Sequence, residues 1–290
     1  MGIKGLNTYL LKNCSNRAIQ SIQLNKLGGT TIVVDVSTYL YRFEMNNMLI
    51  DKMTTFISKL LLYKIIPIII FDGKTPNIKQ FIVDKRHQTK KRAENQYNTL
   101  EKQLDGITNN DLRKKIENDM CKFRRKSPRI NAEKIANIKQ LLDTFNVKYY
   151  TAIEEADEFC ASMVLNGNGW GCLSEDTDMF AYGCPYILRN LNIHSGTVTL
   201  FDMGQILNEL YMTQSTFREM CVISESDYIK TRANILSSNE LIQQFNKINN
   251  DNPQSLFYDW VIHKLHNTIQ KDKLIEVDSM FQLKQFKPIF

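Results

Sequence analysis

Long apolar runs and recognisable export signals are both missing from this sequence. No stretch approaches the roughly 18 to 20 consecutive apolar residues that a membrane-spanning helix requires. The first residues, MGIKGL, lack the cationic and apolar blocks of a secretory signal, and Leu6 stands where a myristoylation signal requires Ser or Thr. The sequence therefore predicts an intracellular protein without a membrane partner.

Cysteine and proline are scarce as well, with six residues of each type. The cysteines are scattered and form no C-x-x-C pair, which argues against a zinc site or a disulfide framework and favours reduced, mostly buried thiols. The composition, 43% hydrophobic and 23% charged residues in a chain of 290, is ordinary for a globular protein. A chain of this length accommodates one large α/β domain with a well-buried core, or two small domains.

Charge is distributed unevenly along the chain. The net charge is +6, yet between Lys79 and Arg129 fifteen basic residues stand against seven acidic ones. This segment therefore carries +8 and the remainder of the chain −2. A basic segment on a slightly acidic body suggests a polyanionic partner, although a solvated helical face would produce the same pattern.

Apolar, β-branched runs alternate with helix-like patterns. The candidate strands are residues 31–34, 65–71 and 170–173, with a shorter candidate at 147–150. The helix-like patterns include residues 53–63 and 132–145. This order predicts an α/β fold with a mostly parallel, twisted sheet and helices on both of its faces. In such sheets the ligand site lies beyond the carboxyl ends of the strands.

Acidic residues occupy those strand ends. They are Asp35 after the first strand, Asp72 after the second, Asp176 and Asp178 after the third, and Glu155 and Asp157 at the start of the helix after the 147–150 strand. Clustered carboxylates repel one another and are costly to desolvate unless cations neutralise them. Oxygen ligands suit Mg²⁺ or Mn²⁺ better than zinc, and two such ions about 4 Å apart clamp the attacking and leaving oxygens of a phosphoryl displacement. The pattern predicts a two-metal phosphodiesterase; each acid taken alone would also fit a helix cap or a solvated turn.

The basic segment interrupts the α/β rhythm. Residues 79–128 are strongly charged and helix-prone, with a turn expected at residues 109–111 between two helices. A charged helical hairpin inserted after the second strand would fold over the site and bring its basic residues to phosphates. A solvent-bridging hairpin without a functional role remains the alternative.

Six motifs, in their order along the chain, resemble a known family. They are MGIKGL, VVDVSTYLYRF, FDGKTPNIKQ, EEADEFCA, SEDTDMFAYG and FREMCVISESDY. Over roughly residues 1–228 they resemble the flap endonuclease/XPG family of structure-specific 5′ nucleases. The resemblance implies a PIN-like 5′-nuclease fold in which the basic segment is the helical arch that admits a 5′ single strand.

The resemblance also implies which residues carry the chemistry. The family's metal-binding carboxylates fall on Asp35, Asp72, Glu155, Asp157, Asp176, Asp178 and Asp227, with Asp157 where relatives more often have Glu. They imply two Mg²⁺ (or Mn²⁺) ions, and Asp176 and Asp178 are expected to be essential for catalysis. The family's two catalytic basic residues fall on Lys79 and Arg86, whose expected role is to polarise the scissile phosphate.

Further residues are expected to contact the substrate. Tyr41 matches the family's aromatic residue that stacks on a base beside the scissile phosphate. Gly2 would place its amine near the site once Met1 is removed. The basic residues of the arch expected to contact phosphates are Lys85, Lys90, Lys91 and Arg92.

The C-terminal third departs from the family pattern. No glycine follows Gly204, so the G-x-G hairpin of the duplex-binding helix-two-turn-helix is absent or remodelled. We therefore expect a nuclease core at residues 1–228, with the arch at about 79–130, and a C-terminal helical segment at residues 229–290. The closing sequence FQLKQFKPIF has aromatic residues without the spacing of a sliding-clamp peptide, so clamp binding has weak support.

The favoured hypothesis is a nuclease that cuts DNA at single-strand/double-strand junctions and removes 5′ flaps in replication or repair. A 5′→3′ exonuclease, on DNA or RNA, and an inactive nucleic-acid-binding scaffold remain alternatives. We expect a monomer located in the nucleus. Its length and its Asn, Ile and Lys richness suggest an AT-rich genome, which would fit a large DNA virus and then a cytoplasmic replication site.

Overall fold

The computed structural model describes residues 2–3, 5–74, 80–104, 110–128, 130–223, 258 and 271–283. Within these ranges the side chains of residues 80–87, 110, 112, 124, 126, 271 and 273 are not described. All statements about the structure refer to these residues.

A seven-stranded sheet forms the centre of the protein, in the spatial order β1-β7-β6-β5-β2-β3-β4. The strands are β1 (Ile19–Gln23), β2 (Thr31–Asp35), β3 (Ile66–Phe71), β4 (Lys148–Thr151), β5 (Gly171–Leu173), β6 (Tyr186–Asn192) and β7 (Thr197–Asp202). The run from β6 to β4 is parallel throughout, whereas β7 is antiparallel to both of its neighbours. The predicted, mostly parallel sheet is therefore confirmed, with an antiparallel edge added.

Alternate residues of the strands enter two separate apolar cores, one on each face of the sheet. Along β2, Val33 packs in one core, whereas Ile32 and Val34 pack in the other. Both faces of β2 are thus dry, which is why its sequence is a continuous apolar run instead of an alternating one.

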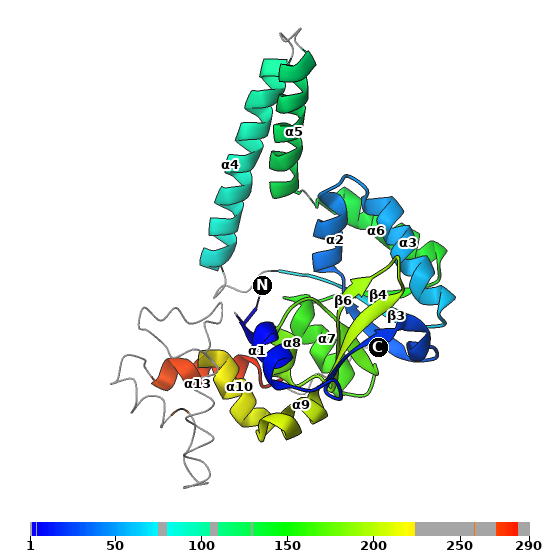
Figure 1. The fold of residues 1–290 in the computed structure, drawn as a ribbon, viewed down its shortest axis with the longest axis vertical. Coiled ribbons are helices and arrows are strands. Elements are labelled where there is room, and N and C mark those ends of the chain that lie inside the picture. The colour runs from blue at the N-terminus through cyan, green and yellow to red at the C-terminus, as the bar shows by residue number, and fades with distance from the viewer. Residues whose placement is uncertain are drawn as a thin grey trace.

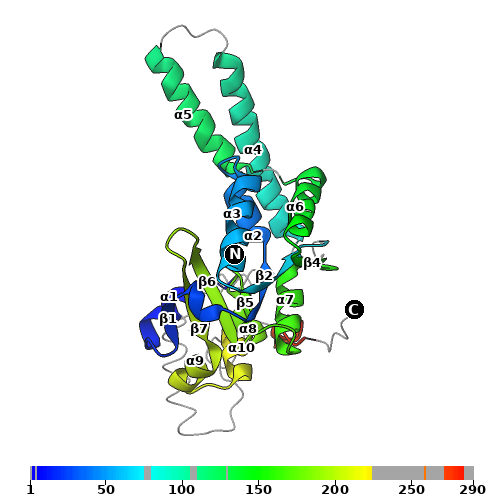
Figure 2. The ribbon, with the colours of Figure 1, turned by 90° about the vertical axis from the view of Figure 1, so that its right-hand side faces the viewer.

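Helices cover both faces (Figures 1 and 2). The first core includes residues of α1 (Leu6–Asn13), α7 (Ala156–Leu165), α8 (Asp178–Tyr182), α9 (Met203–Leu210), α10 (Gln214–Ile223) and α13 (Lys271–Met280). The second includes residues of α2 (Ser37–Glu44), α3 (Leu49–Leu62), α6 (Ala132–Thr144) and the short 3-10 helix η1 (Leu24–Leu27). The result is the three-layer α/β/α arrangement that the alternation of strands and helices predicts.

A helical hairpin stands away from this body (Figure 1). Its two helices, α4 (Gln80–Leu104) and α5 (Asn110–Lys126), pack against each other. Most of their described side chains are exposed, and ion pairs within the helix such as Arg113–Glu117 at 3.2 Å add a few tenths of a kcal/mol each. Neither these nor the other described helices are long and apolar enough to cross a membrane.

The predicted elements differ from the observed ones mainly at their ends. The strand expected at residues 147–150 runs one residue later, as β4, and the helix expected from residue 53 begins at Leu49. Two of the residues expected in the turn at 109–111 already belong to α5, which begins at Asn110, and residue 109 lies outside the described residues. β1, β6 and β7 were not predicted from the sequence.

Candidate active site

The predicted acids gather at the carboxyl edge of the parallel strands. Asp35 is the last residue of β2 and Asp72 follows β3. Glu155 is the N-cap residue of α7, and Asp157 lies in the first turn of that helix. Asp176 lies in the β5–α8 loop, and Asp178 is the first residue of α8. These six acids, far apart in the chain, therefore reach one edge of the sheet through five different elements.

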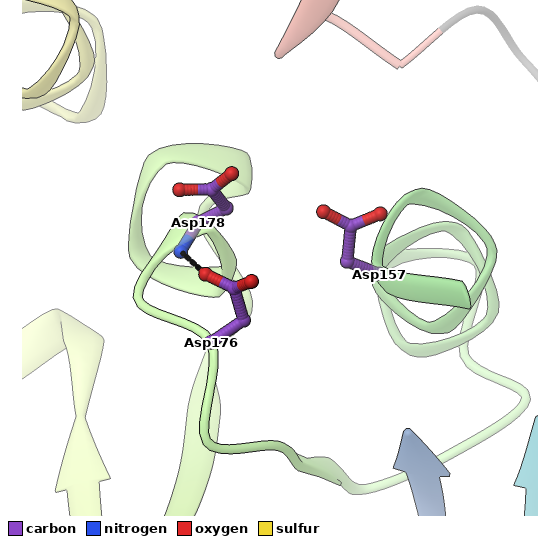
Figure 3. Close-up of side chains that lie close together, drawn as sticks. All are labelled: Asp157, Asp176 and Asp178. Atoms are coloured by element: carbon purple, nitrogen blue, oxygen red, sulfur yellow. Dashed lines mark hydrogen bonds between the residues drawn. The ribbon is translucent and has the colours of Figure 1, made fainter. Parts of the chain in front are cut away.

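Three of the acids lie in direct reach of one another (Figure 3). Carboxylate oxygens of Asp157, Asp176 and Asp178 all lie within 4.8 Å of one another. Asp157 faces the other two from α7, across the gap between that helix and the β5–α8 loop (Figure 3). Asp157 and Asp178 are buried, with 6% and 3% of their surface exposed. Carboxylates this close repel one another, and two of the three are buried, so a cation between them would stabilise their charged forms.

A chain of hydrogen bonds connects this trio to the other strand ends. The Ser37 hydroxyl donates to Asp72, and the Ser37 backbone N–H donates to Asp35 Oδ1 at 3.1 Å. On the other side, the Ser174 hydroxyl donates to Asp35 Oδ2 at 2.8 Å and accepts from the backbone N–H of Asp176 at 3.0 Å. Asp35 is thus held on both of its oxygens, by the start of α2 and by the β5–α8 loop.

Two helix starts complete this frame. The backbone N–H of Ala156, between Glu155 and Asp157, donates to Asp72 Oδ1 at 2.8 Å. The backbone N–H of Asp178 donates to Asp176 Oδ1 at 3.2 Å (Figure 3). Both are N–H groups of a first helical turn, which have no partner inside their own helix and therefore favour a carboxylate.

The environment of Asp35 raises its pKa to about 7. Burial is the largest cause, followed by the negative charge of Asp72 and, to a smaller extent, that of Asp176; the hydrogen bonds from Ser174 and Ser37 act in the opposite direction. A nearby cation would therefore stabilise the charged form of Asp35, which the two hydrogen bonds offset only in part.

Gly2 lies against the same acids. A Cβ at this position would stand 2.2 Å from Asp176 Oδ1 and 3.0 Å from Asp178 Oδ1. Its φ of +84° is also one that L side chains rarely adopt. The next residue, Ile3, donates its backbone N–H to the Thr177 hydroxyl at 2.6 Å, which fixes the start of the chain beside the acids.

Tyr41 lies on α2, the helix that begins beside Asp35. Burial and, secondarily, the charge of Asp72 raise the pKa of its hydroxyl. The Lys90 ammonium, from α4, lies 4.3 Å from the centroid of the Tyr41 ring, in the range of a cation–π contact. The base of the hairpin and the acid cluster thus meet at Tyr41.

The structure describes the remaining predicted site residues only in part. Lys91 and Arg92 are exposed on α4. Lys85 and Arg86 belong to the same helix, in the stretch whose side chains are not described. Lys79 and Asp227 lie outside the described residues.

Several polar residues that support the acids escaped prediction. Ser37 and Ser174 hold Asp35, Thr177 holds the N-terminal segment, and Arg189 on β6 donates to the carbonyl of Glu175. The motifs VDVS and SEDTD, which contain Ser37, Ser174 and Thr177, draw attention to their acids and not to these polar residues. Some of the hydrogen bonds also join residues far apart in the chain, up to 174 positions for Ile3 and Thr177. Only the assembled sheet reveals them.

The ligand atoms of this site fit a divalent cation. The available ligands are carboxylate oxygens, which Mg²⁺ and Mn²⁺ prefer, and no sulfur or imidazole is among them. Asp157, Asp176 and Asp178, with Asp35 beside them, are the described residues that would hold such an ion.

Two family models match the chain. The XPG N-terminal domain matches residues 1–93 and the XPG I-region matches residues 146–227, so together they cover more than half of the sequence. Flap endonuclease 1 of Glycine max is 30% identical over 275 residues, which are 86% of this chain and 68% of that protein. Flap endonuclease 1 of Debaryomyces hansenii is 30% identical over 250 residues, 80% of this chain and 63% of that protein.

Solved structures share the fold. The catalytic core of Rad2 in complex with a DNA substrate superposes with a TM-score of 0.68 and 20% identity, over all of this chain and 90% of that one. Flap endonuclease-1 from Methanococcus jannaschii gives a TM-score of 0.64 and 18% identity, over 93% of this chain and 84% of that one.

The chain belongs to the flap endonuclease/XPG family of structure-specific 5′ nucleases, metal-dependent enzymes that hydrolyse phosphodiesters. The expected family and the PIN-like fold are confirmed. A viral origin has no support among the relatives named above, which come from a plant and a yeast.

Proposed function

We propose that this protein cleaves DNA at single-strand/double-strand junctions, removing 5′ flaps with the help of two Mg²⁺ (or Mn²⁺) ions. The observation that carries the proposal is the trio of aspartates within 4.8 Å, at the foot of a basic helical hairpin. A family relationship supports the same reaction, since both flap endonuclease 1 relatives named above align over most of this chain.

The acids divide the work of holding the cations. Asp157, Asp176 and Asp178 form the centre, and Asp35, Asp72, Glu155 and Asp227 are the proposed outer ligands. Two cations in such a site activate the attacking water and neutralise the charge of the departing oxygen. The hydrogen bonds from Ser37, Ser174 and the helix starts orient the carboxylates before any substrate arrives.

The hairpin supplies the contacts to the DNA. Lys79 and Arg86 are proposed to bind the scissile phosphate and stabilise its charge in the transition state. Lys85, Lys90, Lys91 and Arg92 are proposed to contact neighbouring phosphates of the single strand. Tyr41 offers an aromatic face to the adjacent base, which suits any sequence because every base presents a π-face.

The oligomeric state, cellular location and domain bounds are also proposals. We propose a monomer acting in replication or repair, in the nucleus. A nuclease core at residues 1–228 and a C-terminal segment whose helix-two-turn-helix is absent or remodelled remain part of the proposal; sliding-clamp binding keeps only the weak support of the aromatic residues in FQLKQFKPIF.

A substrate panel tests the proposal directly. The full chain is incubated with end-labelled 5′-flap, gapped and blunt DNA and with the matching RNA, in Mg²⁺, in Mn²⁺ and in EDTA. We expect cleavage of the 5′-flap DNA at the junction, release of an intact flap, and no product in EDTA. Asp176→Asn and Asp178→Asn should abolish cleavage yet bind the flap substrate as before, whereas Ile275→Ala, on the exposed face of α13, should behave as wild type.

Each other outcome assigns a different activity to this protein. Stepwise release of mononucleotides from a blunt 5′ end identifies a 5′→3′ exonuclease, and preference for the RNA substrates moves the target to RNA. Junction binding without cleavage in any metal identifies an inactive scaffold. Full activity of the purified Asp176→Asn, Asp178→Asn double variant contradicts the metal assignment.

A further inference from the structure

The segment that carries Asp176 and Asp178, the β5–α8 loop and the start of α8, contacts the buried guanidinium of Arg189. Arg189 lies on β6 and has only 8% of its surface exposed. Its Nη2 donates to the carbonyl of Glu175 at 2.7 Å, immediately before Asp176. Its guanidinium carbon lies 5.8 Å from the ring centroid of Phe180, two residues after Asp178. Arg189 therefore contacts the acid-bearing segment on both sides.

The same guanidinium reaches the N-terminal segment. Arg189 Nη1 donates to the side-chain oxygen of Asn7, in α1, at 3.2 Å. α1 follows Gly2 and Ile3, which pack on Asp176 and Thr177. One side chain thus joins β6, the start of the chain and the acid-bearing loop.

The side chain of Glu175 adds a second attachment. Its Oε1 accepts the backbone N–H of Asn190 at 3.0 Å, and the Tyr39 hydroxyl lies 3.4 Å away. An Arg42 guanidinium nitrogen lies 3.7 Å from the same oxygen. Tyr39 and Arg42 belong to α2, which also carries Tyr41, so the loop is tied to the element expected to meet the substrate.

An irregularity in β6 makes these contacts available. The pairing between β6 and β7 shifts register between Arg189 and Asn192, and Asn190 has a φ of +53°. Such a bulge turns side chains away from the regular alternation of the strand, and a non-glycine residue with positive φ is sparsely populated. This unfavourable backbone conformation occurs where Arg189 and Asn190 both form hydrogen bonds with Glu175 of the β5–α8 loop. Nε of Arg189 is buried with no hydrogen-bond partner among the described residues, a further sign that placement takes priority over full hydrogen bonding here.

We propose that Arg189 is a positioning residue for the metal centre: it sets Asp176 and Asp178 at the separation that binds divalent cations, without touching cation or substrate. The proposal rests on the metal site of the proposed function. Groups that orient metal ligands typically change metal affinity about 10- to 100-fold when removed, while leaving the ligands themselves in place. Arg189 has this relation to the aspartates, because it bonds the backbone that carries them.

The test measures metal binding separately from cleavage. Mg²⁺ and Mn²⁺ affinities of the DNA-free full chain are measured by titration calorimetry for wild type, Arg189→Met and Arg189→Lys. We expect about 10- to 100-fold weaker binding for Arg189→Met, and a matching rise in the Mg²⁺ concentration for half-maximal flap cleavage. Arg189→Lys should lie in between, since lysine keeps the charge but loses the two-pronged geometry. KM for the flap DNA at saturating Mg²⁺ should stay within about threefold of wild type, because the residue contacts no substrate.

Two variants keep the test decisive. Arg17→Met removes an exposed arginine and should leave metal affinity unchanged. Asn7→Leu removes only the contact to α1 and should fold even if Arg189→Met does not; a several-fold loss of Mg²⁺ affinity is expected. Wild-type Mg²⁺ affinity in folded Arg189→Met or in Asn7→Leu overturns the proposal, even if the variant melts at a lower temperature. If wild type itself binds no divalent cation, it is the proposed metal site that fails instead.

Discussion

At the scale of the single residue, Asp35 has the clearest conflict between its charge and its surroundings. It is almost fully buried, and the two groups whose charges raise its pKa are acids of the same cluster. Ser174 and Ser37 offset part of this effect through hydrogen bonds. An acid in this position exchanges a proton for a cation, so metal binding and protonation must be linked.

Without metal, stability should fall as pH rises from about 4 to about 7. In this window folded Asp35, with its pKa near 7, keeps a proton that the unfolded chain, with a pKa of 3.8, has already released. The expected loss from this group is on the order of 3 to 4 kcal/mol in the free energy of unfolding, as an upper bound. Urea unfolding in EDTA at pH 4 and pH 7 measures it.

Asp35→Asn provides the control for this prediction. It stays neutral at both pH values, so the difference between them should shrink by most of that amount. Saturating Mg²⁺ should also flatten the wild-type dependence, because the cation favours the ionised form. An unchanged pH dependence in the variant would assign the effect to other groups.

Gly2 is the second residue whose identity the site dictates. Gly2→Ala places a Cβ 2.2 Å from an Asp176 oxygen, so either the chain start or the acid must move. A displacement of about 1 Å at a reacting centre costs up to about 10²-fold in rate, and we expect a loss of that order in single-turnover flap cleavage. Gly29→Ala is matched to it, with the same φ of +84° and open space around its Cβ; it should lose about 1 to 2 kcal/mol of stability and keep its activity. Equal activity of the two variants would contradict the packing argument.

At the scale of the element, the central strands follow from their sequences and the edge strands do not. β2 and β3 are buried on both faces, so each is a continuous apolar run that stands out in the sequence. β1 and β7 mix buried and exposed residues, and β6 contains a bulge, so none of the three is a continuous apolar run that stands out in the sequence. The acids of the site could be predicted because they follow the obvious strands. Ser174, Glu175 and Arg189 could not, because their roles depend on contacts between β6, α1 and α2 that no local pattern encodes.

The contact between α2 and α4 leads to a prediction about the substrate. If Tyr41 stacks on a base, Tyr41→Leu should weaken single-turnover cleavage of a 5′-flap substrate about 5- to 150-fold, the equivalent of about 1 to 3 kcal/mol per stacked base. Tyr41→Phe preserves the ring and should retain nearly full activity. The apparent Mg²⁺ requirement should not change in either variant, which separates this effect from that of Arg189. Wild-type cleavage by Tyr41→Leu would exclude a stacking role.

At the scale of the whole molecule, the C-terminal residues that the structure describes pack on the nuclease core. Asp278 of α13 is 7% exposed and pairs with Arg218 Nε of α10 at 3.1 Å. The Tyr258 hydroxyl donates to the same carboxylate at 3.2 Å, and Phe281 meets the ring of Tyr182, in α8, at 5.1 Å. A core ending at residue 228 would lose all of these contacts, one of them with the helix that Asp178 begins.

We therefore expect the C-terminal contacts to contribute to the stability of the catalytic fold itself. Asp278→Ala leaves the Arg218 charge nearly buried without its partner, which should lower the free energy of unfolding by about 3 to 5 kcal/mol. Phe281→Ala should cost a similar amount through lost packing. Ile275→Ala, on the exposed face of the same helix, should change it by less than about 0.5 kcal/mol. Urea unfolding followed by both circular dichroism and tryptophan fluorescence should show one shared transition in each variant, shifted in the first two only. Two separate transitions in wild type, with only one of them sensitive to Asp278→Ala, would instead mean that the C-terminal segment folds apart from the core.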